Sequence, residues 1–158
     1  MNNHDQQILK IERLPAQIKA LVADLTAAQL TTRYLPAEWT VAQNVHHLFD
    51  SHANSYLRCK LIVTEHNPPL KGYDQDVWAA RPDACGPEIS GSLAALTGLH
   101  MRWVTFWRGL ADTDYERVGI HSENGAVRLD DLLALYSGHG ESHIDQIRRT
   151  LAAGGIVR

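Results

Sequence analysis

Four long stretches of this chain repeat their apolar residues at helical spacing, and this repetition constrains the fold more than any other feature. The stretches run from about residue 6 to 25, 40 to 65, 90 to 110 and 130 to 155. Residues three and four positions apart lie on one face of a helix, and an apolar face must be buried against another element. The sequence therefore predicts an all-α fold in the form of a four-helix bundle.

Capping and breaking residues mark where these helices begin and end. Thr40 is a suitable N-cap for the second helix, and the Asn-Pro-Pro run at 67–69 ends that helix. The glycine pair at 154–155 suits the C-terminus of the fourth helix. Pro15 interrupts the first pattern. Because proline lacks an N–H and crowds the preceding turn, we expect it to kink or split that helix.

Two of the connections carry further information. The stretch 66–89 is a long crossover between the second and third helices, with one short turn expected near 75–80. Loops of this length in a compact domain are often functional. Between the third and fourth helices, Asn124-Gly125 is flanked by short β-favouring runs, which predicts a small hairpin or an irregular turn.

Size and charge bound the class of protein. With 158 residues, 44% of them hydrophobic, the chain is expected to form one domain over residues 1–158 with a real core. The net charge is −3 and like charges do not cluster, which argues against binding to nucleic acid or to an anionic membrane.

The sequence also carries signals that bear on the cellular compartment. No apolar run approaches the roughly 20 residues that cross a bilayer, and the first residues lack the basic and apolar regions of a signal peptide. Cys59 and Cys85 are the only cysteines, so no disulfide framework is expected. The reducing cytoplasm is therefore the expected compartment.

The histidine pair His139 and His143 points most directly to chemistry. The two residues lie four positions apart in the fourth helix, in line with Leu132, Leu135 and Tyr136, so both rings should face the bundle interior. Buried imidazoles need partners for their ring nitrogens, and one cation can take a nitrogen from each. The alternative is that both rings are hydrogen-bonded core residues or lie on a solvated helix face. The stacked pair, with more histidines upstream, favours a metal.

A second group of histidines, His46, His47 and His52, lies in the second helix. One of them would complete a three-histidine site that leaves positions open for water or substrate. The cleanest apolar face of that helix includes His52, whereas His47 lies about 120° from Val41, the first residue of that face. A small bundle can bury a broad arc, so periodicity leaves the choice between His47 and His52 open.

The order of these motifs resembles the DinB/YfiT-like superfamily. The likeness is carried by segments 38–52, 54–61, 73–78, 90–93, 99–103 and 135–143, which include His46-His47-Leu48 and the final histidine pair. It covers nearly the whole chain and is closest to the YfiT-type, metal-dependent hydrolase branch, which includes bacillithiol transferases. The resemblance implies a four-helix bundle of DinB/YfiT type with a divalent metal held by His47, His139 and His143. His52 is the fallback for the third ligand.

The fourth helix departs from the family pattern in one respect. Relatives are often richer in histidine around the final pair, whereas Gly140, Glu141 and Ser142 separate the pair here. Gly138 and Gly140 also weaken the helix, because glycine costs about 1 kcal/mol relative to alanine in a helix interior. Glycine at these positions would permit close approach of another backbone.

Several further residues are weaker candidates. Asp50 follows His47 by three residues and is expected either to accept a hydrogen bond from that ring or to be a solvated helix residue. His46 and His52 are interpreted first as hydrogen-bonded residues, with support of the metal or general-base chemistry as the alternative. His100 either lines the pocket or packs in the core. Trp39 is expected to anchor the end of the bundle.

Three neutral imidazoles leave most of a divalent metal's charge uncompensated. The metal, Zn or Ni with Fe also compatible, can then activate water or hold a thiol as thiolate. We therefore expect a metal-dependent hydrolase or a thiol S-transferase that acts on a small molecule. The resemblance implies a bacillithiol-type thiol as co-substrate and suggests a homodimer. The alternative is a non-catalytic, metal-stabilised bundle that binds or senses a small molecule.

Overall fold

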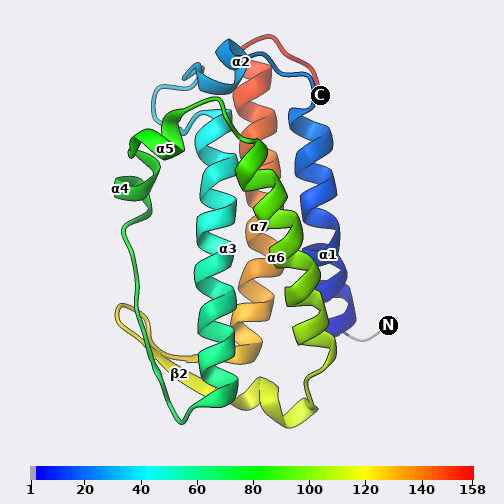
Figure 1. The fold of residues 1–158 in the computed structure, drawn as a ribbon, viewed down its shortest axis with the longest axis vertical. Coiled ribbons are helices and arrows are strands. Elements are labelled where there is room, and N and C mark those ends of the chain that lie inside the picture. Colours follow the sequence, from blue (N-terminus) through cyan, green and yellow to red (C-terminus); the bar gives the residue numbers. More distant parts are fainter. Residues whose placement is uncertain (1–2) are drawn as a thin grey trace.

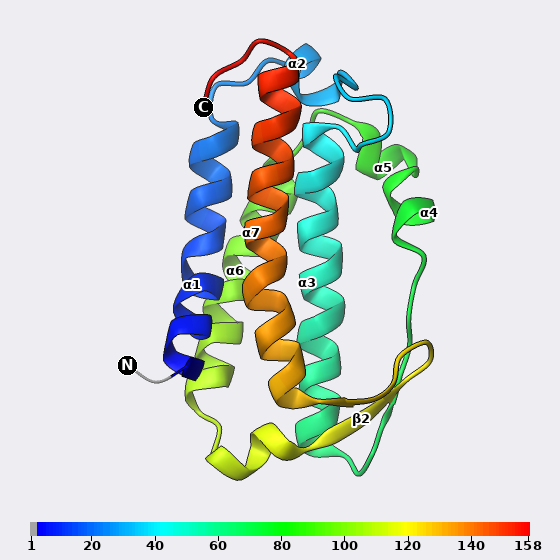
Figure 2. The same ribbon diagram turned by 180° about the vertical axis from the view of Figure 1, so that it is seen from behind.

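Four long helices form the body of residues 3–158, the part that the structure, a computed structural model, describes (Figure 1). They are α1 (Asn3–Val22), α3 (Val41–Thr64), α6 (Ser90–Arg108) and α7 (Leu129–Ala153). Helices α1 and α3 each pack against both α6 and α7, so α1 and α3 lie diagonally opposite each other (Figure 2). The predicted four-helix bundle is confirmed.

The crossover between α3 and α6 runs along the outside of α3 (Figure 1). It carries two short helices, α4 (Gln75–Ala79) and α5 (Pro82–Cys85), where the sequence predicts a single turn. The other short helices in the described range are α2 (Ala27–Thr31) and the 3-10 helix η1 (Asp112–Glu116).

A small sheet ties the crossover to the connection between α6 and α7. In the described part its strands are β1 (Pro69–Leu70), β2 (Val118–His121) and β3 (Gly125–Arg128), with β1 parallel and β3 antiparallel to β2. The predicted hairpin is confirmed. Gly125 follows its turn with a φ of +71°, a conformation that glycine adopts without strain. Strand β1 was outside the prediction because two residues are too few to show alternation.

The capping residues act where the sequence places them. The Thr40 side chain accepts a hydrogen bond from the Gln43 backbone N–H, and the Gln43 side chain accepts one from the Thr40 N–H. This capping box satisfies two backbone donors and fixes where α3 begins. Gly154 ends α7, as predicted. The start of α3 in turn determines the direction in which each of its histidines points.

Pro15 lies inside α1 without splitting it, so the alternative of a split helix is wrong. An interior proline costs a helix about 3 kcal/mol or more, because it deletes a hydrogen bond to the carbonyl four residues earlier. That carbonyl belongs to Ile11, and it accepts a hydrogen bond from Nδ1 of His100 in α6, at 2.6 Å. A side chain from a neighbouring helix thus compensates for the missing backbone bond.

The core consists of two apolar clusters with a polar layer between them. On α3 the buried residues of one cluster end at Leu48, and those of the other begin at Cys59. On α6 the corresponding residues are Leu96 and Trp103. The buried polar residues that lie between the clusters include Ser51, His52, Ser55, His100, Ser137 and His143. Burying polar side chains is costly unless they find partners, so the residues of this layer need a hydrogen-bond network or a bound ligand.

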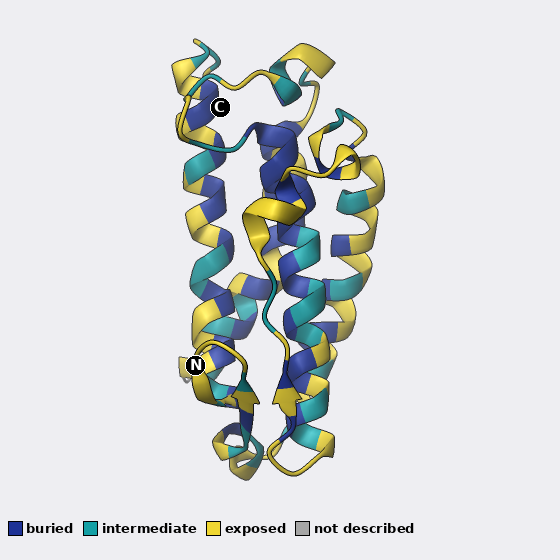
Figure 3. Ribbon diagram, turned by 90° about the vertical axis from the view of Figure 1, so that its left-hand side faces the viewer, coloured by how far each residue is buried: buried dark blue, intermediate teal, exposed yellow. Residues whose placement is uncertain are grey.

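Burial otherwise follows the helix faces, with exposed residues on the outer sides of the bundle (Figure 3). Leu135 is an exception. The sequence pattern places it in the core stripe of α7, but its side chain is 58% exposed and lines a cavity beside the histidines. Among residues 3–158, no helix combines the length and apolar character that crossing a membrane requires.

Gly138 and Gly140 allow the packing of α7 to be tested. A Cβ at Gly140 would lie 2.5 Å from Leu14 Cδ2, whereas a Cβ at Gly138 would meet nothing within 4 Å. We predict that Gly138→Ala raises the free energy of unfolding by about 0.5–1 kcal/mol through helix propensity. Gly140→Ala gains the same propensity but must displace the buried Leu14 side chain, at a cost of about 1–3 kcal/mol. Urea denaturation should rank Gly140→Ala as the less stable variant, and equal stabilities would contradict the close contact between α1 and α7.

Candidate metal centre

Three imidazoles from two helices converge at the edge of the polar layer. His47 comes from α3, and His139 and His143 come from successive turns of α7. Each offers one ring nitrogen, and these three atoms lie within 4.8 Å of one another. The ring centroids are 4.5 Å apart for His139 and His143, 4.9 Å for His47 and His143, and 5.4 Å for His47 and His139. The structure thus brings together the three histidines that the family resemblance selects.

Asn44 holds the ring of His143. The Asn44 side chain donates from Nδ2 to the Thr40 carbonyl at 2.9 Å, which turns Oδ1 toward Nδ1 of His143 at 2.8 Å. Because an amide oxygen only accepts, Nδ1 of His143 carries the proton and Nε2 presents a lone pair. Sequence reasoning missed Asn44, since an asparagine within a helix gives no local signal of a partner 99 residues away.

His139 is held from the other side by His52. Nδ1 of His139 lies 3.1 Å from Nε2 of His52, and Nδ1 of His52 lies 2.8 Å from Nε2 of His100. Nε2 of His139 faces Nε2 of His143 at 3.2 Å. The structure therefore places His52, the fallback ligand, behind His139 and not among the converging nitrogens. His100 packs in the same network and also lines a groove on the far side of the bundle.

His47 has a buried nitrogen without a partner. Its Nε2 makes no hydrogen bond within the described residues, and a buried polar atom left unpaired costs about 1–3 kcal/mol. The ring tilts against the indole of Trp39, with centroids 4.6 Å apart. The Trp39 Nε1 donates to Asp76 of α4 at 3.0 Å. Trp39 thus covers the histidines and fastens the crossover over them, beyond the anchoring role expected from sequence.

The donor set fits a divalent metal ion. Nε2 of His143 presents a lone pair, Nε2 of His47 has no partner, and Nε2 of His139 points into the same space. A cation at the centre would satisfy all three nitrogens at once. Uncharged imidazole donors suit Zn²⁺, Ni²⁺ and Fe²⁺.

Burial keeps these rings neutral. It lowers the pKa of His47 and of His139 to about 3, and that of His143 to about 4. For His47 and His139, neighbouring histidines lower the pKa further, because a second positive charge would be repelled. At neutral pH the cluster therefore needs to lose no proton from these rings before it accepts a metal.

Within residues 3–158, two of the weaker candidates form no hydrogen bond to the cluster rings. His46 is hydrogen-bonded through Nδ1 to Ser92 at 2.8 Å and through Nε2 to the Gly86 carbonyl at 3.3 Å, so it is the ordinary hydrogen-bonded residue that the sequence favours. Asp50 is half-buried, and burial is the main cause of its raised pKa. No hydrogen bond within residues 3–158 joins the Asp50 carboxylate to His47, so no contact supports the expectation that Asp50 orients that ring.

Two cavities reach the cluster, and His139 lines both. One, of about 370 Å³, also borders Trp39, Asp76 and His143. The other, of about 490 Å³, extends along α3 and α7 to the small sheet. Its polar lining includes Ser51, Arg58, Tyr73, His121 and Tyr136. The side of the cluster that faces the crossover therefore has room for water or a substrate, and sequence reasoning missed this lining because it comes from four separate segments.

The pKa shifts predict how the metal-free protein responds to acid. In the unfolded chain these histidines titrate near pH 6.5, whereas His47, His139 and His143 titrate near pH 3–4 when folded. As the pH falls below about 6.5, the unfolded state binds protons first, so stability should fall by up to about 1.4 kcal/mol per pH unit for each ring. The loss should continue until the folded pKa values are reached. Urea denaturation of chelator-treated protein at several pH values measures this slope, which should become shallower in His143→Gln. A slope of zero would contradict the neutral cluster.

Comparison with known proteins identifies a family and several similar proteins. The family model of the DinB superfamily matches residues 10–147. A protein of Oceanobacillus iheyensis named "Putative metal-dependent hydrolase" is 42% identical over 143 residues, which are 90% of this chain and 83% of that protein. A Bacillus mycoides protein of the same name is also 42% identical over 143 residues, covering 90% of this chain and 82% of its own length.

A solved structure extends the likeness to the fold. YfiT from Bacillus subtilis, described as "a probable metal-dependent hydrolase with an unusual four-helix bundle topology", matches with a TM-score of 0.93 and 38% sequence identity. The match covers 99% of this chain and 91% of that chain. The family model spans most of the sequence, and the relatives agree with it. The chain therefore belongs to the DinB superfamily and is of the YfiT type.

Proposed function

We propose that this protein is a metal-dependent enzyme whose three-histidine centre activates water or a low-molecular-weight thiol toward a small-molecule substrate. The observation that carries the proposal is the convergence of three neutral ring nitrogens beside an open cavity. A structural metal site is closed by four protein ligands, whereas a catalytic site leaves a position open. Within the described residues this cluster offers three. Activation of water corresponds to hydrolysis, and activation of a thiol corresponds to S-transfer.

Under this proposal, some residues hold the metal and others orient the rings that hold it. His47, His139 and His143 would hold the metal, with Zn²⁺ or Ni²⁺ preferred and Fe²⁺ compatible. Such an ion supplies Lewis acidity, which lowers the pKa of a coordinated water to about 7 or favours the thiolate form of a thiol. Asn44 and His52 orient two of the three rings through hydrogen bonds.

The wall of the larger cavity carries hydrogen-bond donors for a substrate. The Tyr136 hydroxyl lies 3.4 Å from the Ser51 hydroxyl, next to the metal cluster. Burial raises the pKa of Tyr73, so its phenol stays protonated at neutral pH. Neutral O–H groups of this kind can donate to an oxygen on which negative charge develops, as hydrolysis of an ester or amide requires.

Arg58 indicates the charge of the substrate. Its side chain is only 9% exposed, and it lines the same cavity as His139. Within residues 3–158 it pairs with no carboxylate and donates instead to the Lys71 carbonyl. Asp74, which also lines this cavity, uses its carboxylate to cap α4. We infer that Arg58 leaves a guanidinium donor for a substrate that carries a carboxylate or another anionic group.

Metal content tests the ligand set. Elemental analysis of protein purified without chelators should find one divalent metal per chain. His47→Ala, His139→Ala and His143→Ala should each abolish stoichiometric binding, because two imidazoles remain. His46→Ala is the matched control, since it removes a buried neighbour on α3 that faces away from the cluster. Full metal occupancy in His139→Ala would refute the assignment.

Chelation separates an enzyme from a metal-stabilised bundle. The metal-loaded protein should turn over members of a panel of thiol-plus-electrophile pairs and simple esters and amides. Removal of the metal should stop that reaction while the helical circular dichroism at room temperature is kept. A chelated protein that loses its helices, together with no reaction in the panel, would favour the non-catalytic bundle.

Arg58 can be tested with matched esters that differ only in a free carboxylate. Arg58→Met should raise KM for the carboxylate-bearing ester about 10- to 100-fold, since a hydrogen bond to a charged group contributes roughly 1.5–3 kcal/mol. The neutral ester should be unaffected. Arg58→Lys, which keeps the charge but not the planar fork, should lie between. Equal losses on the two esters would show that Arg58 only supports the crossover.

A further inference from the structure

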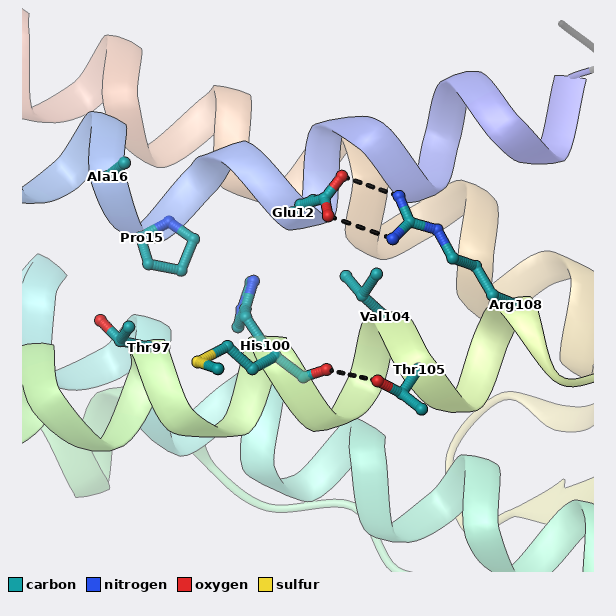
Figure 4. A pocket seen from close by; sticks show the side chains of 9 residues that line it. Glu12, Pro15, Ala16, Thr97, His100, Val104, Thr105 and Arg108 are labelled. Carbon is teal, nitrogen blue, oxygen red and sulfur yellow. Dashed lines mark hydrogen bonds and ion pairs between the residues drawn. The ribbon is translucent and has the colours of Figure 1, made fainter.

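A chain of hydrogen bonds crosses the bundle from α1 to the cluster of His47, His139 and His143. It runs from the Ile11 carbonyl to Nδ1 of His100 at 2.6 Å, from Nε2 of His100 to Nδ1 of His52 at 2.8 Å, and from Nε2 of His52 to Nδ1 of His139 at 3.1 Å. Figure 4 shows its outer end, where the His100 ring points from α6 toward α1 opposite Pro15. The chain is therefore anchored on a backbone atom and ends on a ring of the cluster.

The backbone end gives the chain a direction. A carbonyl oxygen only accepts, so the proton of neutral His100 must lie on Nδ1, which leaves Nε2 as an acceptor. His52 must then donate from Nδ1, and its Nε2 becomes an acceptor in turn. His139 must donate from Nδ1 to that atom. The lone pair of His139 is consequently on Nε2, which faces His143 across the centre of the cluster.

Other proton arrangements are unfavourable. If His52 carried its proton on Nε2, its Nδ1 would face Nε2 of His100 at 2.8 Å with no hydrogen between them. A second proton on His100 would repair that contact, but burial lowers the pKa of His100 to about 4. Only one arrangement of three neutral rings makes every bond in the chain.

Pro15 makes the anchor available. In an uninterrupted helix the Ile11 carbonyl would accept from the backbone N–H of residue 15, and proline has none. The carbonyl is thus free to receive His100. His52, next in the chain, is fully buried, and the rings of Trp103 and Tyr136 stand nearly perpendicular to it at 5.6 Å and 5.1 Å. These edge contacts restrict rotation of the His52 ring.

We propose that Pro15, His100 and His52 are positioning residues that fix the proton of His139 on Nδ1 and so aim its Nε2 at the metal. The proposal rests on the proposed metal-binding role of His139. It assigns no proton transfer to the chain, because a carbonyl at the outer end has no proton to supply. What these hydrogen bonds transmit is an orientation, from a missing backbone hydrogen bond in α1 to the proposed ligand His139 on α7.

The tautomers can be read directly by NMR. In the metal-free wild-type protein with ¹⁵N-labelled histidine, long-range ¹H–¹⁵N spectra should show His100, His52 and His139 protonated on Nδ1. His100→Phe removes both hydrogen bonds of that ring. His52 is then free to carry its proton on Nε2, the nitrogen that faces His139. His139 should then populate the Nε2–H form, and the affinity for Zn²⁺ should fall about 10- to 100-fold. Competition with a chromophoric chelator measures this affinity.

Two further variants separate positioning from loss of packing. His100→Gln keeps one donor and one acceptor at this position and should restore much of the Zn²⁺ affinity and the Nδ1–H form of His139. Val104→Ala, one turn along the same buried face of α6, removes apolar packing without touching the chain and should leave both unchanged. Nε2 protonation of His139 in the wild-type protein would overturn the proposal, as would equal Zn²⁺ affinities in His100→Phe and Val104→Ala. If Zn²⁺ fails to bind the wild-type protein, the proposed function fails, while the metal-free spectra still decide the arrangement of protons.

Discussion

Burial of uncharged imidazoles is the constraint on which the rest of this structure depends. A ring nitrogen removed from water must find a donor, an acceptor or a cation, and the polar layer between the two apolar clusters contains many such atoms. Asn44 satisfies one, and the Ile11 carbonyl satisfies another. Once these bonds are assigned, the remaining nitrogens of His47, His139 and His143 face one another. The proposed metal centre is therefore where protein groups alone leave ring nitrogens unsatisfied.

Local sequence signals were sufficient for most of the bundle. Helix spacing places the four long helices to within a few residues, and Thr40 and Gly154 mark real termini. The pair His139 and His143 is also a local signal, because a separation of four fixes both rings on one face. No local signal identifies the third histidine of the site. The rotation rule favours His52, but both His47 and His52 are buried, because α3 packs against α6 and α7 and also against the short helices of the crossover. Within the sequence, only the family resemblance distinguishes the two residues.

What the sequence could not predict consists of contacts between distant segments. Asn44 and His143 are 99 residues apart, and Ile11 and His100 are 89 residues apart. Neither pair has a spacing rule, since each depends on how whole helices are placed. Pro15 illustrates the difference. The sequence alone shows that Pro15 removes one backbone hydrogen bond from α1. The bond that replaces it comes from His100 on another helix, and only the three-dimensional structure shows it.

At the small sheet, backbone hydrogen bonds hold the two segments that border the larger cavity, whereas side chains form its lining. Strand β1 joins β2 through backbone groups, from the Ile120 N–H to the Pro68 carbonyl at 2.8 Å and from the Ser122 N–H to the Leu70 carbonyl at 2.9 Å. Such bonds do not depend on side-chain identity. Rim side chains that take no part in joining the two segments can therefore be exchanged during evolution without displacing the loops. Ser122 is an exception, because its hydroxyl accepts from the Gly72 N–H at 2.8 Å. Under the proposed function, homologous proteins with the same histidines can differ in the molecules that they bind while the chemistry at the centre stays the same.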